Sequence, residues 1–170
     1  ATLVASLIEK YPYAVVQTRE LGHEQLPYIN NAWVTANLTD ENARTEADRQ
    51  ILNKSDELIT QLKSADIIVF GYPMYNFAIP ATLKTYLDLV CRRGHTFEYT
   101  QTGPIGLFVG KTAVCLSGHR RHTTCLILRP RNPVHQAHLR VHGYENGYII
   151  LDLVSRISTR VAEGSKIDFD

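Results

Sequence analysis

The chain has 170 residues and a formal net charge of +1 at pH 7, with 44% hydrophobic and 21% charged residues. The length predicts one domain with a core of ordinary size, and the composition excludes a disordered chain and a strongly polyanion-seeking one. No apolar run approaches the roughly 20 residues of a membrane span, and the first residues show no signal-peptide pattern. The three cysteines share no metal-ligand spacing and leave an odd thiol, which favours a reduced cytoplasmic setting.

The first third of the chain predicts helix, strand and helix in that order. Residues 1–9 have apolar side chains at helical spacing and read as the end of a helix, and residues 13–16 predict a short strand. Residues 26–36, with a proline and two asparagines, predict a loop. Thr39 is the expected N-cap of a long helix that runs towards Asp66 with apolar residues along one face.

A buried strand with a distinctive loop follows. Ile67-Ile68-Val69-Phe70 is apolar without alternation, which is typical of a strand covered by helices on both faces of a parallel sheet. In open α/β sheets the ligand lies just beyond the carboxyl ends of such strands. Met74-Tyr75-Asn76-Phe77 stands there and offers two rings, a thioether and an amide to a flat heterocycle with polar edges. A turn that packs its own aromatic side chains is the alternative, and the residues alone leave both interpretations open.

The loop leads into a predicted amphipathic helix. Pro80 suits its first position, and an apolar stripe follows at i, i+4 and i+7 spacing. Arg92 and Arg93 are expected in the last turn, where cations complement the helix dipole, and Gly94 is expected at the C′ position. Residues 112–116 then predict a further strand. This alternation of helices and strands is typical of a doubly wound α/β fold, and we expect the chain to begin after the first element of that fold.

Five blocks of this sequence resemble the FMN-dependent NADH-azoreductases, which are flavodoxin-like quinone reductases. In chain order the blocks are Pro73-Met74-Tyr75-Asn76-Phe77, Leu83-Lys84-x-Tyr86-x-Asp88, Thr96-Phe97-Glu98-Tyr99-Thr100, Gly103-Pro104-x-Gly106-Leu107 and Gly110-Lys111. The resemblance is strong over residues 55–118, weaker over residues 1–53 and absent from His119 onwards.

The resemblance implies a flavodoxin-like doubly wound parallel sheet and non-covalent FMN, reduced by NADH. The reduced flavin would pass two electrons to a quinone or an azo compound. The residues that it places against the flavin ring are Met74, Tyr75, Asn76 and Phe77, with Ser117 and Gly118 at the start of a second flavin loop.

Tyr99 and Phe97 match positions near the face where nicotinamide and acceptor bind in turn, although packing within their own loop is an alternative role. The resemblance also implies a homodimer, with residues 97–99 as a candidate interface. We expect no catalytic side chain, no metal, and neither nucleic acid nor membrane as a partner.

Two features depart from the family. A flavodoxin-like sheet begins with a strand and a turn that holds the flavin phosphate at a helix N-terminus, and this chain is expected to start inside that helix. The first strand and the phosphate loop are therefore predicted to be missing. Beyond Gly118, the underlying codons can be read one nucleotide later. In that shifted reading frame, codons compatible with this sequence can encode three segments that resemble those of the family, in the same order as in the family. We therefore expect residues 1–118 to form a partial FMN-binding domain and residues 119–170 an aberrant, frame-shifted tail without a native core.

The tail also allows other interpretations. His135, His138 and His142 have helical spacing for a metal, and a cluster of arginines could mark a nucleic-acid patch. Pro130 and Pro133 interrupt this region and no cysteine or carboxylate completes a metal site, so we predict neither. For the whole protein, the alternatives to the reductase are a flavodoxin-like electron carrier without turnover, an inactive remnant, and a phosphodiesterase acting on a carrier protein.

Overall fold

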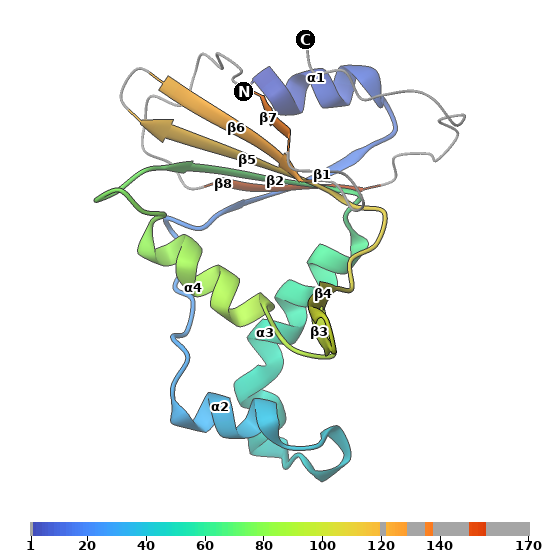
Figure 1. Cartoon of the computed structure of the whole chain (residues 1–170), viewed down its shortest axis with the longest axis vertical. Coiled ribbons are helices and arrows are strands. Elements are labelled where there is room, and N and C mark those ends of the chain that lie inside the picture. The colour runs from blue at the N-terminus through green and yellow to red at the C-terminus, as the bar shows by residue number, and fades with distance from the viewer. Residues whose placement is uncertain (1, 120–121, 129–134, 138–149, 156–170) are drawn as a thin grey trace.

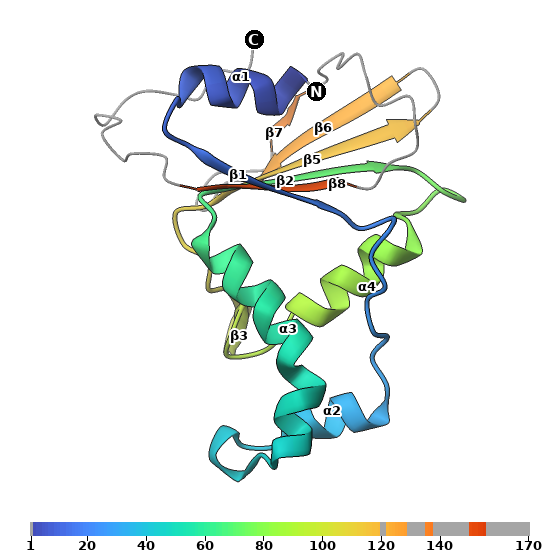
Figure 2. The same cartoon turned by 180° about the vertical axis from the view of Figure 1, so that it is seen from behind.

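The computed structural model describes residues 2–119, 122–128, 135–137 and 150–155. Their elements form a six-stranded sheet of order β1-β8-β2-β5-β6-β7 and a separate β3-β4 hairpin. In Figures 1 and 2, α1 covers one face of the sheet, and α3 and α4 cover the other. The bounds are α1 (Thr2–Lys10), β1 (Val15–Glu20), α2 (Asn31–Leu38), η1 (Glu41–Ala43), α3 (Glu46–Ser64), β2 (Ile67–Pro73), α4 (Ala81–Val90), β3 (Phe97–Thr100), β4 (Gly103–Gly106), β5 (Thr112–His119), β6 (His122–Leu128), β7 (His135–Ala137) and β8 (Ile150–Ser155).

The α/β fold with a buried β2 is confirmed, but the sheet is mixed. In the described part of the chain only β2 and β5 pair in parallel, and every other pairing is antiparallel. Two residues separate β5 from β6, and a parallel connection needs a crossover of a dozen or more residues. The strands on either side of β2 and β5 therefore depart from the expected all-parallel sheet.

Strand β8 lies between β1 and β2 and pairs antiparallel with both. A flavodoxin-like sheet has the strand order 2-1-3-4-5. Since β1 is expected to be the second strand of that order and β2 the third, β8 occupies the position of the first strand in the reverse direction. Leu151 and Val154 are fully buried there, and Leu153 is nearly so. The expectation that residues 119–170 add nothing to the core is therefore wrong for these three residues.

The helical segment before β2 differs from its prediction. Residues 31–38 form α2 rather than a loop, because Asn30 caps it by accepting a hydrogen bond from the backbone N–H of Trp33 at 2.9 Å. Thr39 ends α2 instead of starting a long helix, and its N–H donates to the Thr35 carbonyl. The long helix α3 begins only after Thr45, whose hydroxyl accepts from the N–H of Asp48 while the Asp48 carboxylate accepts from the Thr45 N–H.

Thr45→Ala is expected to lower the free energy of unfolding by about 1 kcal/mol, because the first turn of α3 loses a capped backbone N–H. Thr39→Ala is the matched control. Thr39 is half-buried, and its hydroxyl donates to the Thr35 carbonyl of the helix that it follows in a solvent-exposed hydrogen bond, so its loss is expected to have a smaller effect. Urea unfolding of both variants, followed by far-UV circular dichroism, measures the difference, and equal midpoints would contradict the cap assignment.

Helix α4 ends earlier than predicted. It covers Ala81–Val90, and its C-cap is Cys91, whose N–H donates to the Leu87 carbonyl at 2.9 Å. Arg92 therefore lies outside the helix, and its side chain is buried rather than placed at the dipole. Gly94 has a φ of +78° but belongs to the turn before β3 and not to the helix end. No helix in the described ranges is long and apolar enough to span a bilayer.

Candidate functional site

The segment after β2 begins at the edge of the sheet where the two parallel strands end. In the β2-β5 register, Tyr72 lies beside Ser117 and Pro73 beside Gly118. The Met74 N–H then donates to the Gly118 carbonyl at 2.9 Å. The structure therefore brings the predicted Met74–Phe77 segment and the predicted Ser117 and Gly118 together at the carboxyl ends of parallel strands, where α/β sheets bind ligands.

A tight two-residue turn shapes this segment. Tyr75 and Ala78 exchange backbone hydrogen bonds of 3.0 and 2.9 Å across it. The two central residues are left-handed, with φ of +48° for Asn76 and +63° for Phe77, as in a type I′ turn. Asparagine tolerates this region, whereas phenylalanine rarely adopts it. The surrounding structure holds Phe77 in a strained conformation, a feature that clusters at binding sites.

The side chains of the turn face solvent. Phe77 is 93% exposed, Tyr75 is 51% exposed and Met74 is 37% exposed. The rings consequently do not pack a hydrophobic turn of their own, which was the alternative interpretation. Burial, followed by the nearby Cys115 thiol, raises the pKa of Tyr72, which lies on β2 shortly before the turn, so its phenol stays neutral and able to donate. The site thus combines exposed apolar surface, an amide and a neutral hydroxyl.

Ser117 and Gly118 do not start a loop. They lie within β5, where they pair with Tyr72 and Pro73 on one side and with β6 on the other. The prediction of a second loop is wrong because β6 follows immediately and extends the ladder to His119. Their assignment as cofactor contacts stays a prediction, supported by the hydrogen bond from Met74 to Gly118.

Phe97 and Tyr99 lie on β3, away from the turn. Their rings meet edge to face with centroids 5.3 Å apart, and Tyr99 is 61% exposed. The turn precedes the N-terminal end of α4, whereas Figures 1 and 2 show the β3-β4 hairpin beyond its C-terminal end. A helix of ten residues is about 15 Å long. A single chain therefore does not bring Tyr99 to the Met74–Phe77 segment.

Sequence reasoning missed a buried polar cluster around Arg92. Its guanidinium contacts residues of α2 and α3 and lies over the Trp33 ring, 5.9 Å from the centroid. The partners lie 36 to 55 residues away along the chain, so no local pattern marked them. Of the histidines considered for a metal, His138 and His142 lie outside the described residues, as does the His135 side chain.

Comparisons with known proteins now decide the family. Residues 1–122 match the family model described as a flavodoxin-like fold. The chain belongs to the flavodoxin-like family. This match confirms the fold class expected from the sequence, with the reversed β8 and the β5-β6 hairpin as this chain's departures from it.

Curated relatives and solved structures extend the comparison. FMN-dependent NADH:quinone oxidoreductase 1 of Hahella chejuensis is 44% identical over 111 residues, which cover 65% of this chain and 54% of that protein. A Burkholderia pseudomallei FMN-dependent NADH:quinone oxidoreductase is 44% identical over 115 residues, covering 68% and 58%. The azoreductase of Bacillus anthracis strain Sterne superposes with a TM-score of 0.61 at 34% identity, over 67% of this chain and 56% of that one.

A second solved structure contains FMN. The FMN-dependent NADH-azoreductase of Bacillus anthracis strain Ames Ancestor, in complex with FMN, superposes with a TM-score of 0.51 at 30% identity, over 57% of this chain and 47% of that one. The flavodoxin-like chain spans about half the length of the curated relatives that it matches. The family match over residues 1–122 includes the Met74–Phe77 turn, and the activity of the whole protein is a matter for proposal.

Proposed function

We propose that the protein is an FMN-dependent NADH:quinone oxidoreductase that also reduces azo compounds. The observation that carries this proposal is the exposed, left-handed turn of Met74–Phe77 at the carboxyl ends of β2 and β5. The relatives named as FMN-dependent NADH:quinone oxidoreductases, and an azoreductase solved with FMN, support it. We assign residues 1–118 to the FMN-binding domain.

The turn fits the ring system of FMN. Met74, Tyr75 and Phe77 offer exposed apolar surface to the face of a flat heterocycle. The backbone N–H groups of Asn76 and Phe77 make no hydrogen bond within the described ranges. They are left as fixed donors at the tip of the turn, next to the Asn76 side-chain amide. Such donors stabilise negative charge on a ring edge, as preorganised donors do elsewhere.

Bound FMN would supply the redox chemistry, accepting a hydride from NADH and delivering two electrons to the acceptor. The chain's own residues bind and orient. In our proposal the turn holds the ring, with Ser117 and Gly118 beside its other edge, and the Tyr72 phenol stays protonated. Phe97 and Tyr99 would form one wall of the acceptor pocket.

We further propose a homodimer in the cytoplasm. Because α4 separates Tyr99 from the turn within one chain, a second copy is the simplest way to place a β3-β4 hairpin over the flavin. Tyr99 and Ile105, the exposed large side chains of that hairpin, support its use as an interface. Cys91 carries a free thiol, which suits a reducing compartment.

The proposal is tested by mixing the purified chain with FMN and following flavin fluorescence, then NADH oxidation with menadione as acceptor. Saturable flavin binding and acceptor-dependent NADH oxidation are expected. Flavin binding with negligible oxidation would favour the electron-carrier alternative. If the chain neither binds FMN nor melts cooperatively, it is an inactive remnant. Hydrolysis of a carrier-protein phosphodiester in a preparation free of flavin and metal would instead revive the phosphodiesterase.

Phe77→Gly is expected to weaken FMN binding about fivefold, because ring stacking contributes about 1 kcal/mol. Glycine adopts a positive φ readily, so the turn keeps its shape and only the ring is lost. Tyr13→Ala removes an equally exposed ring, 88% accessible, far from the turn and serves as the control. Fluorescence titration with FMN measures both variants, and equal dissociation constants would rule out Phe77 as a flavin contact.

A further inference from the structure

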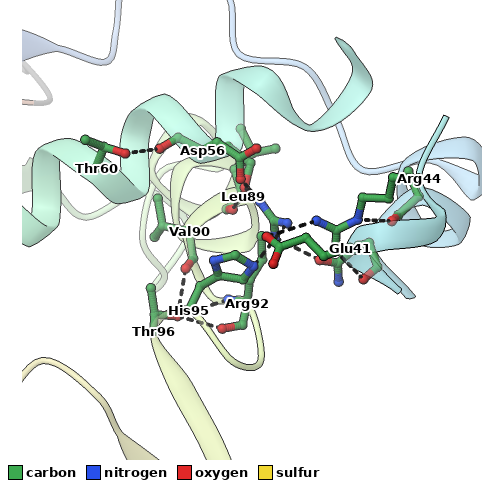
Figure 3. A network of polar contacts seen from close by, with 12 residues as sticks. Glu41, Arg44, Asp56, Thr60, Leu89, Val90, Arg92, His95 and Thr96 are labelled. Atoms are coloured by element: carbon green, nitrogen blue, oxygen red, sulfur yellow. Dashed lines mark hydrogen bonds and ion pairs between the residues drawn. The ribbon is translucent and has the colours of Figure 1, made fainter. Parts of the chain in front are cut away.

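Arg92 joins α2 and α3 to the segment that follows α4, and it does so from a buried position. Its side chain has no exposed surface. The Nε donates to the Asn37 Oδ1 of α2 at 2.8 Å, and Nη1 donates to the Ser55 hydroxyl at 3.0 Å and to the Asp56 carboxylate of α3 (Figure 3). These contacts fix the position of the segment that follows α4.

The remaining guanidinium nitrogen meets His95. Arg92 Nη2 lies 3.5 Å from His95 Nε2. A guanidinium has donors only, so the contact requires Nε2 to be an unprotonated acceptor and the imidazole to be neutral. Protonation would turn Nε2 into a donor that faces a donor, and it would set two cations against each other.

The segment that these residues occupy anchors the β3-β4 hairpin. The Arg92 N–H donates to the Thr96 hydroxyl at 3.0 Å, and that hydroxyl donates to the Val90 carbonyl at 2.8 Å. The Gly94 N–H donates to the Phe97 carbonyl at 2.8 Å, and the Leu107 N–H donates to the Thr96 carbonyl at 2.9 Å. The first residue of β3 and the first residue after β4 are therefore both tied to the 92–96 turn.

Charged groups from each neighbouring element act on His95. Arg92 in its own turn and Lys63 of α3 oppose protonation, whereas Asp56 of α3 and Glu41 of η1 favour it. Burial is the largest influence and Arg92 the second, and together they lower the pKa of His95 below its ordinary value of 6.5. The neutral form is therefore favoured by folding, and the unfolded chain binds more protons. The stability from this contact is complete above pH 6.5 and is lost as the pH falls through the lowered pKa.

We propose that His95 and Arg92 form a pH-dependent latch on the β3-β4 hairpin: neutral His95 keeps the latch closed, and protonation opens it. The latch requires no flavin. It would regulate the surface that carries Phe97 and Tyr99, whichever ligand or partner copy that surface meets.

The only tryptophan of the chain reports on the latch directly, because the Arg92 guanidinium lies over the Trp33 ring. Trp33 emission of the whole chain, titrated from pH 8 to pH 4.5, is expected to change in a single step below pH 6.5. His95→Gln keeps a polar atom near the Nε2 position but cannot be protonated, so the step should vanish. His23→Gln is the control, because His23 is exposed on another segment, with its Nδ1 3.5 Å from the Glu20 carboxylate, and it should keep the step. A flat wild-type titration, or a step that survives in His95→Gln, overturns the proposal.

Hydrogen exchange then tests the hairpin itself. The protection factors of the Gly94, Thr96 and Leu107 amides are expected to fall by up to about tenfold for each pH unit between 6.5 and the lowered pKa of His95, because in that window opening takes up one proton. His95→Gln should hold them constant across the same range. Its circular dichroism melt at pH 8 confirms that the variant is folded. A fluorescence step without any change in these protection factors would mean that Arg92 moves but the hairpin does not, and it would also overturn the proposal.

Discussion

Replacing Arg92 with methionine is expected to lower the free energy of unfolding by about 3 kcal/mol, one of the two largest effects that we predict for this chain. Methionine keeps much of the apolar stem, so the loss comes from the guanidinium contacts with Asn37, Ser55 and Asp56. Removing one partner of a buried ion pair costs roughly 3–5 kcal/mol. The lower end applies here because the Asp56 side chain is 49% exposed and water can solvate it.

Arg93→Met is the matched control for this prediction. It is the next residue, but its side chain is 68% exposed and forms an ion pair with Glu98. Exposed ion pairs contribute little, so no resolvable change is expected. Arg92→Lys should fall between the two, because an ammonium keeps the charge but lacks the planar fork that reaches three partners. Urea unfolding measures all three variants, and equal midpoints for Arg92→Met and Arg93→Met would refute the buried network.

The contrast between the two arginines shows where sequence reasoning stops. Both were predicted to complement the dipole of a helix that ends at Gly94, because the local pattern treats them alike. The apolar stripe of α4 was correctly predicted, since a period near 3.6 follows from the residues themselves. The burial of Arg92 was not, because its partners come from α2 and α3. A contact between elements remote in sequence leaves no local signal.

Some features of the candidate site were likewise predictable from local sequence, and others were not. The place of Met74–Phe77 was predictable, because a buried strand followed by a polar-aromatic segment marks the carboxyl edge of an α/β sheet. Its left-handed pair was not, since a type I′ turn is usually marked by glycine after asparagine and here Phe77 stands in that place. Ser117 and Gly118 were predicted in a loop because the family pattern continues that way. The adjoining β6 decides otherwise in this chain.

The second large loss of stability is predicted for a substitution in strand β8. Leu151→Ala is expected to lower the free energy of unfolding by about 3 kcal/mol, because a fully buried leucine leaves a cavity between the sheet and the helices. Leu151 lies opposite Arg19 of β1 and Phe70 of β2, in the middle of the sheet, where neighbours on both sides limit relaxation. Leu38→Ala is the control, since Leu38 is 78% exposed and its loss should cost less than about 0.5 kcal/mol.

This comparison also separates the two interpretations of residues 119–170. If that segment is a frame-shifted tail with no packing role, both leucine variants melt like the parent chain, and the position between β1 and β2 is left without a strand. If β8 completes the sheet, Leu151→Ala alone melts early, and the segment stabilises the fold whatever its origin. The antiparallel register favours the second outcome, because the six residues of β8 pair with β1 and five of them also pair with β2. A strand at that position supplies hydrogen bonds that two buried edges would otherwise lack.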